Sequence, residues 1–286
     1  MPTLHIMKGL PASGKTTFAR ELVAKGAVRV NRDDLRAMMH NGKWSRRNEP
    51  EIINAEKSIV RNCMSAGRDV VVDDTNLLHN IWESFVSPTG GKQRVHDFTH
   101  ISPEECVQRD MARQTGRVGP AVIYRMAAQA GLLQFTGRPI VICDIDGTLA
   151  DLRHRLHYVQ QTPKDWDSFF ARCDEDRVYH DVLDQVEELS KTHDIVFVSG
   201  RRGDAQTASA TFEWLRQTGV QFVGLLMRRA DDRRPDDQVK EELLRLLPRE
   251  RVALVIDDRP RVIRMWQRNG LNVQQVHPEL WEGKED

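Results

Sequence analysis

The stretch Pro139–Leu149, PIVICDIDGTL, restricts the possible folds more than any other part of the chain. The apolar run 140–143, with Ile145 just beyond it, predicts a buried parallel strand. Asp144 and Asp146 follow at once, and carboxylates are not buried without partners. A buried strand that ends in carboxylates and a glycine turn is how open α/β sheets place a site at their carboxyl edge. The alternative is an ordinary strand followed by an Asp-Gly turn.

Length and composition favour a two-domain globular protein. The chain has 286 residues, of which 40% are hydrophobic and 29% charged, so each domain has room for its own core. It has no run of 18 apolar residues, and its N-terminus lacks the apolar core of a signal peptide. The four cysteines form no CxxC pair, which argues against a zinc site or a disulfide framework. We therefore expect a cytoplasmic protein with no membrane partner.

The charge balance gives no general signal for nucleic acid, because 42 basic residues meet 42 acidic ones. Local basic clusters are still available for contacts with an anionic substrate. Whether they are solvated surface or substrate contacts stays open at this point. The clusters are Lys43, Arg46 and Arg47 in the first half, and Arg228, Arg229, Arg233 and Arg234 in the second.

A P-loop opens the first half. The residues 4–7 predict a short strand, GLPASGKT follows from Gly9 to Thr16, and the next ten residues have helical periodicity. In such a loop the backbone N–H groups and the helix N-terminus bind phosphate, Lys15 reaches the β and γ oxygens, and Thr16 holds Mg²⁺. The predicted ATP-binding residues are Gly9, Ser13, Gly14, Lys15, Thr16 and Thr17.

Acidic residues follow the next two predicted strands, residues 27–31 and 69–72. Asp33 comes after the first strand and Asp74 after the second. A carboxylate at this edge, facing the P-loop, can accept a proton from an attacking hydroxyl. By composition alone, the acids cap the following helix, Arg36 lies on the surface, and Asp74 belongs to a simple turn.

Two arginines, Arg109 and Arg113, are spaced i, i+4 on a helix predicted to begin at Pro103. The glycine-rich segment TGRVGP that follows is suited to a mobile lid. Two arginines on one lid face can stabilise the charge on a phosphoryl group in transfer. The alternative is a solvated helix face.

The second half follows a linker, residues 131–139. Residues 151–180 show no sheet pattern, and three aromatic residues there (Trp166, Phe169 and Phe170) suggest a small helical insertion beside the site. The histidines in or near the insertion match no zinc spacing. Polar residues end the later predicted strands and mark one helix: Ser199, Gly200, Arg201, Lys240, Asp257 and Asp258.

These motifs of the second half resemble those of the haloacid-dehalogenase phosphatase superfamily, in the family's order. D-x-D-G-T resembles motif I, which implies Asp144 as the nucleophile and Asp146 as a general acid/base. Ser-Gly-Arg at 199–201 resembles motif II, VKEE at 239–242 motif III, and IDDR at 256–259 motif IV. The resemblance implies a substrate-binding set of Thr148, Ser199, Gly200, Arg201 and Lys240, and a Mg²⁺ site of Asp144, Asp146 (through its carbonyl), Asp257 and Asp258.

In the first half, NRDDLR and DVVVDDTNL resemble the acceptor-side motifs of phage-type polynucleotide kinases. This implies that Asp33 is the general base, that Arg36 binds a nucleic-acid phosphate, and that Asp74 helps to orient the acceptor. The lid of P-loop kinases has the same arginine spacing as Arg109 and Arg113.

Over its whole length the chain resembles the phage-type polynucleotide 5′-kinase/3′-phosphatases. The resemblance implies an α/β fold of two doubly wound parallel-sheet domains: a P-loop kinase at 1–133 and a phosphatase with a small helical cap at 138–286. It implies ATP as phosphate donor, Mg²⁺, and DNA or RNA ends with a 5′-hydroxyl or a 3′-phosphate as substrates. The segment 151–180 departs from the family pattern.

Two other functions remain as alternatives. One is a small-molecule kinase fused to a small-molecule phosphatase, which the neutral net charge permits. The other is a nucleotide-gated binding module, which the candidate base and lid arginines disfavour. A downstream ligase as partner, a homo-oligomeric state and the choice between DNA and RNA stay open.

Overall fold

The computed structural model describes residues 1–78 and 91–281. They form two compact units, 1–109 and 110–286, which are described one at a time. Within the described residues, every helix is too short or too polar to cross a membrane.

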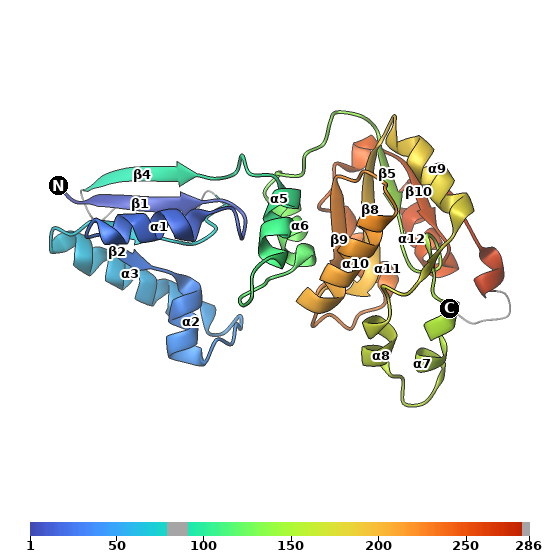
Figure 1. The fold of residues 1–286 in the computed structure, drawn as a ribbon, viewed down its shortest axis with the longest axis horizontal. Helices are drawn as coiled ribbons and strands as arrows, with labels where there is room; N and C mark the ends of the chain where they lie inside the picture. The colour runs from blue at the N-terminus through green and yellow to red at the C-terminus, as the bar shows by residue number, and fades with distance from the viewer. Residues whose placement is uncertain (79–90, 282–286) are drawn as a thin grey trace. The chain divides into compact units, whose positions relative to one another are not determined.

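The first unit is built on a four-stranded parallel sheet (Figure 1). Its strands are β1 (Thr3–Lys8), β2 (Val28–Val30), β3 (Val70–Val72) and β4 (Lys92–Asp97), in the order β2-β3-β1-β4. Leu4 pairs with Val70 and Thr3 with Lys92, so β1 lies between β3 and β4. This register brings the ends of β1, β2 and β3 to one edge, as predicted.

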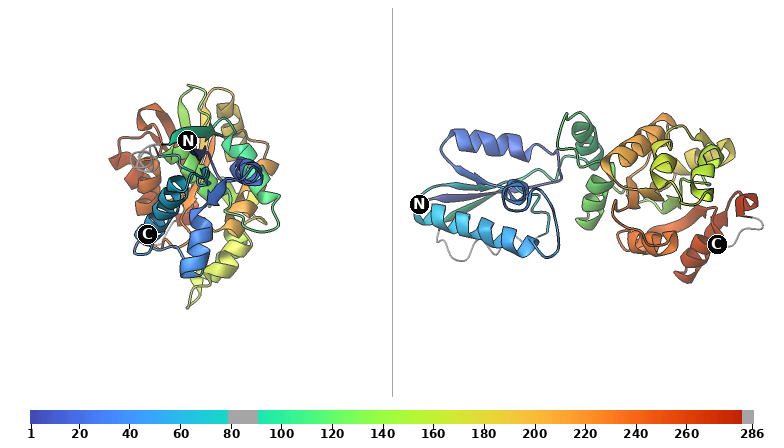
Figure 2. Two further views of the ribbon diagram at one scale, coloured as in Figure 1. Left: turned by 90° about the vertical axis from the view of Figure 1, so that its left-hand side faces the viewer. Right: turned by 90° about the horizontal axis from the view of Figure 1, so that it is seen from below.

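Two helices, α1 (Lys15–Ala24) and α3 (Glu49–Ser65), cover opposite faces of this sheet (Figure 2). Because side chains alternate along a strand, Leu4 and Ile6 pack toward α3, whereas Met7 packs toward α1. Helices α2 (Arg32–His40) and α5 (Pro103–Met111) complete the unit's described helices, α5 running two residues beyond Arg109.

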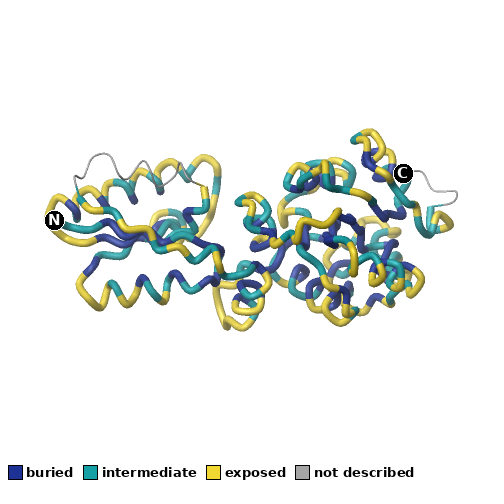
Figure 3. The backbone as a smooth tube through the Cα atoms, turned by 90° about the horizontal axis from the view of Figure 1, so that it is seen from above, coloured by how far each residue is buried: buried dark blue, intermediate teal, exposed yellow. Residues whose placement is uncertain are grey.

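The second unit contains a five-stranded parallel sheet, in which β5 is fully buried and β8 and β9 are mostly buried (Figure 3). Its order is β11-β10-β5-β8-β9. The bounds are β5 (Ile140–Cys143), β8 (Asp194–Arg202), β9 (Gly224–Arg228), β10 (Val252–Asp257) and β11 (Val273–Gln275). The strand predicted from the apolar run 140–143 is therefore the central strand, β5.

Helices α6 (Pro120–Gln129), α9 (His180–Ser190), α10 (Ala205–Gln217), α11 (Asp236–Leu244) and α12 (Pro260–Arg268) surround this sheet. Short 3₁₀ turns occupy 153–155, 249–251 and 278–281. Helix α6 packs on β9 and α10, with Tyr124 and Phe212 in ring contact. Packing thus groups residues 110–130 with the second sheet, whereas the sequence-based division falls at 133–138.

A small insertion follows β5, as the sequence predicts. It begins and ends with the short antiparallel pair β6 (Ala150–Asp151) and β7 (Arg177–Val178). Between them, α7 (His157–Gln160) and α8 (Trp166–Ala171) pack together beyond one end of the sheet (Figure 1). We call residues 152–176 the cap.

Candidate active sites

The P-loop connects β1 to α1. Gly14 is the N-cap of α1 with φ of 103°, a left-handed conformation that glycine adopts without strain. At Gly9 an added Cβ would lie 2.7 Å from Ser13 Oγ and 2.9 Å from Phe98 Cβ. Lys15 is buried, and its Nζ donates to the Leu10 carbonyl at 2.5 Å, so the ammonium already lies inside the loop. Thr17, also predicted to bind ATP, is exposed.

Thr16, the predicted Mg²⁺-binding hydroxyl, contacts an acid that sequence reasoning missed. Its Oγ1 donates to Asp73 Oδ1 at 3.3 Å, and Arg29 Nε donates to Asp73 Oδ2 at 2.7 Å. Burial raises the pKa of Asp73, although Arg29 and Thr16 oppose that shift. A P-loop hydroxyl beside a strand-end aspartate is the usual Mg²⁺ arrangement of P-loop enzymes. Asp73 is the first acid after the strand VVV, and that position was the signal in the sequence; the family resemblance indicated Asp74 instead.

Asp33 lies in the first turn of α2 and is 86% exposed. Asn31 caps this helix, because its Oδ1 accepts from the backbone N–H groups of Asp33 and Asp34 at 2.9 and 3.1 Å. Arg36 pairs with Asp33 and forms a two-point ion pair with Glu49, at 3.0 and 2.7 Å. The predicted base and the predicted phosphate-binding arginine are therefore neighbours one helical turn apart.

Asp74 contacts the N-terminus of α2. Its Oδ1 accepts from the Arg32 backbone N–H at 3.1 Å, and Arg32 Nε also donates to the fully buried Glu56 at 2.7 Å. Burial and the neighbouring Asp74 carboxylate raise the pKa of Glu56 to about 9, which favours its protonated form, although Arg32 opposes that shift. The structure places Asp74 under the N-terminus of α2, within the group of residues that holds Asp33 in place.

Arg109 lies over the P-loop, with its Nη1 3.4 Å from the Ser13 carbonyl and its Nη2 2.5 Å from Glu105 Oε1. The prediction that Arg109 and Arg113 share one helix face is wrong, because α5 ends at Met111. Arg113 follows the helix and contacts Asp110 at 3.4 Å. Asp110 is buried and accepts from the backbone of Val118 and Gly119, which fixes the glycine-containing segment.

In the second unit, Asp144, Lys240 and Asp257 meet at the carboxyl edge of the sheet. Lys240 Nζ lies 2.8 Å from Asp144 Oδ1 and 2.9 Å from Asp257 Oδ2. Burial alone would lower the pKa of Lys240, but the two carboxylates outweigh it and raise that pKa. Burial raises the pKa of Asp144, and Lys240 opposes that shift. The ammonium thus favours the ionised form that a nucleophilic carboxylate requires.

Asp258 joins Asp144 and Asp257, so that one ligand atom from each of the three buried carboxylates lies within 4.8 Å of the others. Burial, reinforced by the charge of Asp257, raises the pKa of Asp258 to about 7. Oxygen ligands that are difficult to ionise without a nearby cation fit Mg²⁺. Thr148 Oγ1 donates to Asp258 at 3.0 Å, so this predicted substrate ligand also orients the acid.

Asp146 is held by two buried arginines, Arg155 and Arg201. Its Oδ1 accepts from Arg155 Nη2 at 2.6 Å and from Arg201 Nη2 at 2.7 Å. Burial favours the protonated carboxyl, but the two arginines prevail and lower the pKa of Asp146. Asp176, also buried, accepts from both arginines at 2.6 Å. Sequence reasoning missed Arg155 and Asp176, since they lie in the cap segment that departs from the family pattern.

Residues 199–201 are tightly packed and lie within β8, which continues to Arg202 where the sequence predicted a strand end with a glycine turn. Ser199 is fully buried, and its Oγ accepts from the Arg201 backbone N–H at 3.1 Å. A Cβ at Gly200 would overlap Asp236 Oδ1, so any larger residue there would displace the Asp236 carboxylate. Arg201 lies behind Asp146, where its guanidinium is fully buried.

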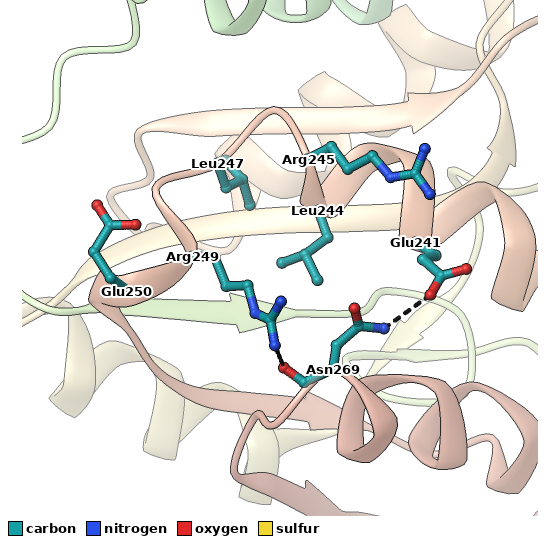
Figure 4. A pocket seen from close by; sticks show the side chains of 7 residues that line it. All are labelled: Glu241, Leu244, Arg245, Leu247, Arg249, Glu250 and Asn269. Carbon is teal, nitrogen blue, oxygen red and sulfur yellow. Dashed lines mark hydrogen bonds between the residues drawn. The ribbon is translucent and has the colours of Figure 1, made fainter.

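A cavity of about 1060 Å³ opens above Asp144 and Lys240, and the cap and the loop 228–236 form its walls. A second hollow, of about 370 Å³, lies beside α11 and α12 (Figure 4). There Asn269 donates to Glu241 at 3.0 Å and its carbonyl accepts from Arg249, so these polar groups bind one another. None of the predicted catalytic or metal-binding residues lines this second hollow.

Two family models match the chain. The model of the polynucleotide kinase PNKP phosphatase domain matches residues 138–280, half of the chain, and an AAA domain model matches residues 4–133. The chain therefore belongs to the polynucleotide kinase phosphatase-domain family, with a P-loop domain before it.

Among curated proteins, the chain is 30% identical over 298 residues to a protein of Autographa californica nuclear polyhedrosis virus, assigned as a bifunctional polynucleotide kinase/RNA ligase. The match covers 92% of this chain but spans only 41% of the viral protein. Among solved structures, a chain of the Pnkp1/Rnl/Hen1 RNA repair complex is 27% identical over 96% of both chains, with a TM-score of 0.41. A haloacid dehalogenase-like hydrolase from Streptococcus pneumoniae is 16% identical, covers 49% of this chain and 85% of its own, and has a TM-score of 0.35.

Proposed function

We propose that the protein repairs nucleic-acid ends: it phosphorylates 5′-hydroxyl ends with ATP and removes phosphate from 3′ ends. The observation that carries the proposal is the group of Asp144, Lys240, Asp257 and Asp258 at one sheet edge, in a chain that also contains a complete P-loop. Membership of the PNKP phosphatase-domain family favours polynucleotide substrates over small molecules.

In the phosphatase half, Asp144 attacks phosphorus, which forms an aspartyl-phosphate and breaks the bond to the 3′-oxygen. Lys240 favours the ionised form of Asp144 against the effect of burial and, with Ser199 and the backbone of the turn after β5, holds phosphoryl oxygens. Mg²⁺ would be held by Asp144, Asp257, Asp258 and the Asp146 carbonyl, and it supplies charge neutralisation at the phosphate.

Asp146 then provides proton transfer. Its two arginines favour the carboxylate, which is the form that deprotonates the hydrolytic water. For the first step it must carry a proton to the leaving 3′-oxygen. A phosphate dianion bound beside it opposes the arginines and raises its pKa toward that role.

In the kinase half, Lys15 and the P-loop N–H groups hold ATP, with Thr16 and Asp73 around Mg²⁺. Asp33 accepts the proton of the 5′-hydroxyl, and Arg109 with Arg113 stabilises the transferring group. Arg36, aided by Lys43, Arg46 and Arg47, binds the phosphate 3′ to the accepting nucleoside, and this anion competes with Glu49 for its guanidinium.

The test uses one oligonucleotide that carries a 5′-hydroxyl and a 3′-phosphate, incubated with γ-labelled ATP and Mg²⁺. We expect label at the 5′ end and release of unlabelled phosphate from the 3′ end. The resulting ends are those that a ligase joins, so we propose a nucleic-acid ligase as the downstream partner. Equal labelling rates for a bare nucleoside and a nucleoside 3′-phosphate would instead favour a small-molecule kinase.

A further inference from the structure

The cavity above Asp144 is larger than the phosphoryl group needs. Its volume of about 1060 Å³ is at the upper end of the range for small-molecule sites. Asp144 and Lys240 belong to its lining, and the cap contributes an apolar wall that includes Leu156 and Val159. The alcohol part of a phosphate ester must therefore extend along this wall.

Trp166 is the conspicuous residue of the wall. It is 45% exposed, although it carries the largest apolar surface of any side chain type. Behind it, Phe170 is stacked at a centroid distance of 5.9 Å and 23° between the rings, and Phe169 contacts it edge-on at 5.8 Å. Both phenylalanines are buried, so they hold the indole in place while part of it remains open to the cavity.

The cations of the same cavity differ in whether a carboxylate neutralises them. Arg202 pairs with Asp167, Arg228 with Asp236, Arg234 with Asp232, Arg259 with Asp236, and Arg261 with Asp237. Arg233 is exposed and has no ion-pair or hydrogen-bond partner among the described residues. Lys164 contacts only the Trp166 ring, 5.8 Å from its centroid, among those residues. Within residues 1–78 and 91–281, Arg233 and Lys164 are therefore two cations of the cavity lining or its edge that no carboxylate pairs with.

We propose that this cavity binds the end of a single-stranded nucleic acid, with the Trp166 indole stacked on a base and with Arg233 and Lys164 contacting backbone phosphates upstream of the 3′-phosphate. The inference rests on the proposed 3′-phosphatase function and adds its substrate class. Stacking on an aromatic ring and contact with unpaired cations are the two means by which proteins bind single strands without reading sequence. A duplex end would have to separate its terminal pair to reach this ring.

The test compares kcat/KM for release of phosphate from three substrates: an oligonucleotide 3′-phosphate, the same strand with abasic terminal residues, and a nucleoside 3′-phosphate. Trp166→Ala should lower kcat/KM about 5- to 150-fold on the intact oligonucleotide and less than about twofold on the abasic strand. Trp166→Phe should retain most of the activity. Arg233→Ala should affect the oligonucleotide but not the nucleoside 3′-phosphate, and should reduce the dependence on salt.

Arg216→Ala, an exposed arginine of α10 outside the cavity, is the matched control, and the melting temperature of the full chain reports whether each variant is folded. Equal losses for Trp166→Ala on intact and abasic strands would show that Trp166 only supports the cap, and would overturn the inference. So would a wild-type enzyme that prefers a small phosphorylated alcohol to every strand. If no strand released phosphate while a small ester did so through Asp144, the proposed function would fail as well.

Discussion

Asp144 and Asp33 are the two carboxylates on which the proposed reactions depend, and their surroundings differ sharply. Asp144 is buried between Lys240 and two further acids, whereas Asp33 is 86% exposed and its side chain pairs, among the described residues, only with Arg36. A nucleophile that becomes part of an intermediate must be oriented before the substrate arrives. A base that accepts a proton from a bound hydroxyl can be oriented by substrate binding itself. We therefore expect substitutions in the phosphatase site to alter both activity and stability, and those at Asp33 to alter activity alone.

The largest effect is expected for Asp144→Asn, which keeps the shape of the side chain but removes the nucleophile. The release of 3′-phosphate should fall by about 10³-fold or more, while 5′-labelling persists because the P-loop and Asp33 are intact. The two activities are measured on the same oligonucleotide preparation.

Phosphate release at a near-normal rate by Asp144→Asn would place the nucleophile elsewhere. Loss of the kinase activity as well, in a variant with a wild-type melting temperature, would mean that the two sites do not act independently.

Asp33→Ala should lower the rate of 5′-labelling by about 10²- to 10⁴-fold with ATP binding intact. Asp34→Ala is the matched control, because Asp34 is the adjacent acid of α2 and contacts Arg29 at 2.5 Å. Since the Asp33 side chain is exposed, the melting temperature of Asp33→Ala should match that of the wild type. Equal effects at the two positions would show that the charge of the first turn matters, not a base at Asp33.

Asp176→Asn tests the buried side of the comparison. Asp176 holds Arg155 and Arg201, which in turn hold Asp146, so its loss should displace Asp146 and lower phosphatase kcat about 10- to 100-fold. Because the arginines would be left partly unpaired in the interior, the melting temperature should fall too. Asp181→Asn, an exposed acid in the first turn of α9, serves as control. An inactive Asp176→Asn with unchanged melting would contradict the idea that preorganisation and stability are linked here.

The sequence predicted both sheets because β1, β3, β5 and β10 are short apolar runs that end in polar residues, a pattern with few other solutions. It predicted the group of Asp144, Lys240 and Asp257 because each lies in a motif of recognisable spacing. It did not predict Arg155 or Asp176, since their contacts join residues of the cap to the end of β8 and depend on how a segment without periodicity folds. Nor did it predict the end of α5 at Met111, because the spacing of Arg109 and Arg113 is helical whether or not the helix continues.

The sequence pattern also did not predict which sheet α6 packs against. Its apolar residues, among them Ile123 and Tyr124, indicate an amphipathic helix but do not say which sheet it covers. Contact with β9 places it with the second unit. A helix face specifies only that a partner exists, so a domain boundary drawn from motifs alone need not coincide with one drawn from packing.

The smallest effect concerns Glu56, a buried acid beneath the exposed Asp33. Folding raises the pKa of Glu56 to about 9, so between pH 4.5 and that value the folded state binds a proton that the unfolded state lacks. The free energy of unfolding must then fall as pH rises through this window, by up to about 1.4 kcal/mol per pH unit. Glu56→Gln is neutral in both states and removes this slope. Its stability relative to the wild type should therefore increase by about 1–2 kcal/mol from pH 7 to pH 8.5, as measured by hydrogen exchange of the α3 amides in the full chain. Glu51→Gln, an exposed position of the same helix, should show no such change. A stability difference between Glu56→Gln and the wild type that does not change with pH would mean that Arg32 keeps Glu56 ionised. Helix α2 would then be supported by the Arg32–Glu56 ion pair and not by a protonated Glu56.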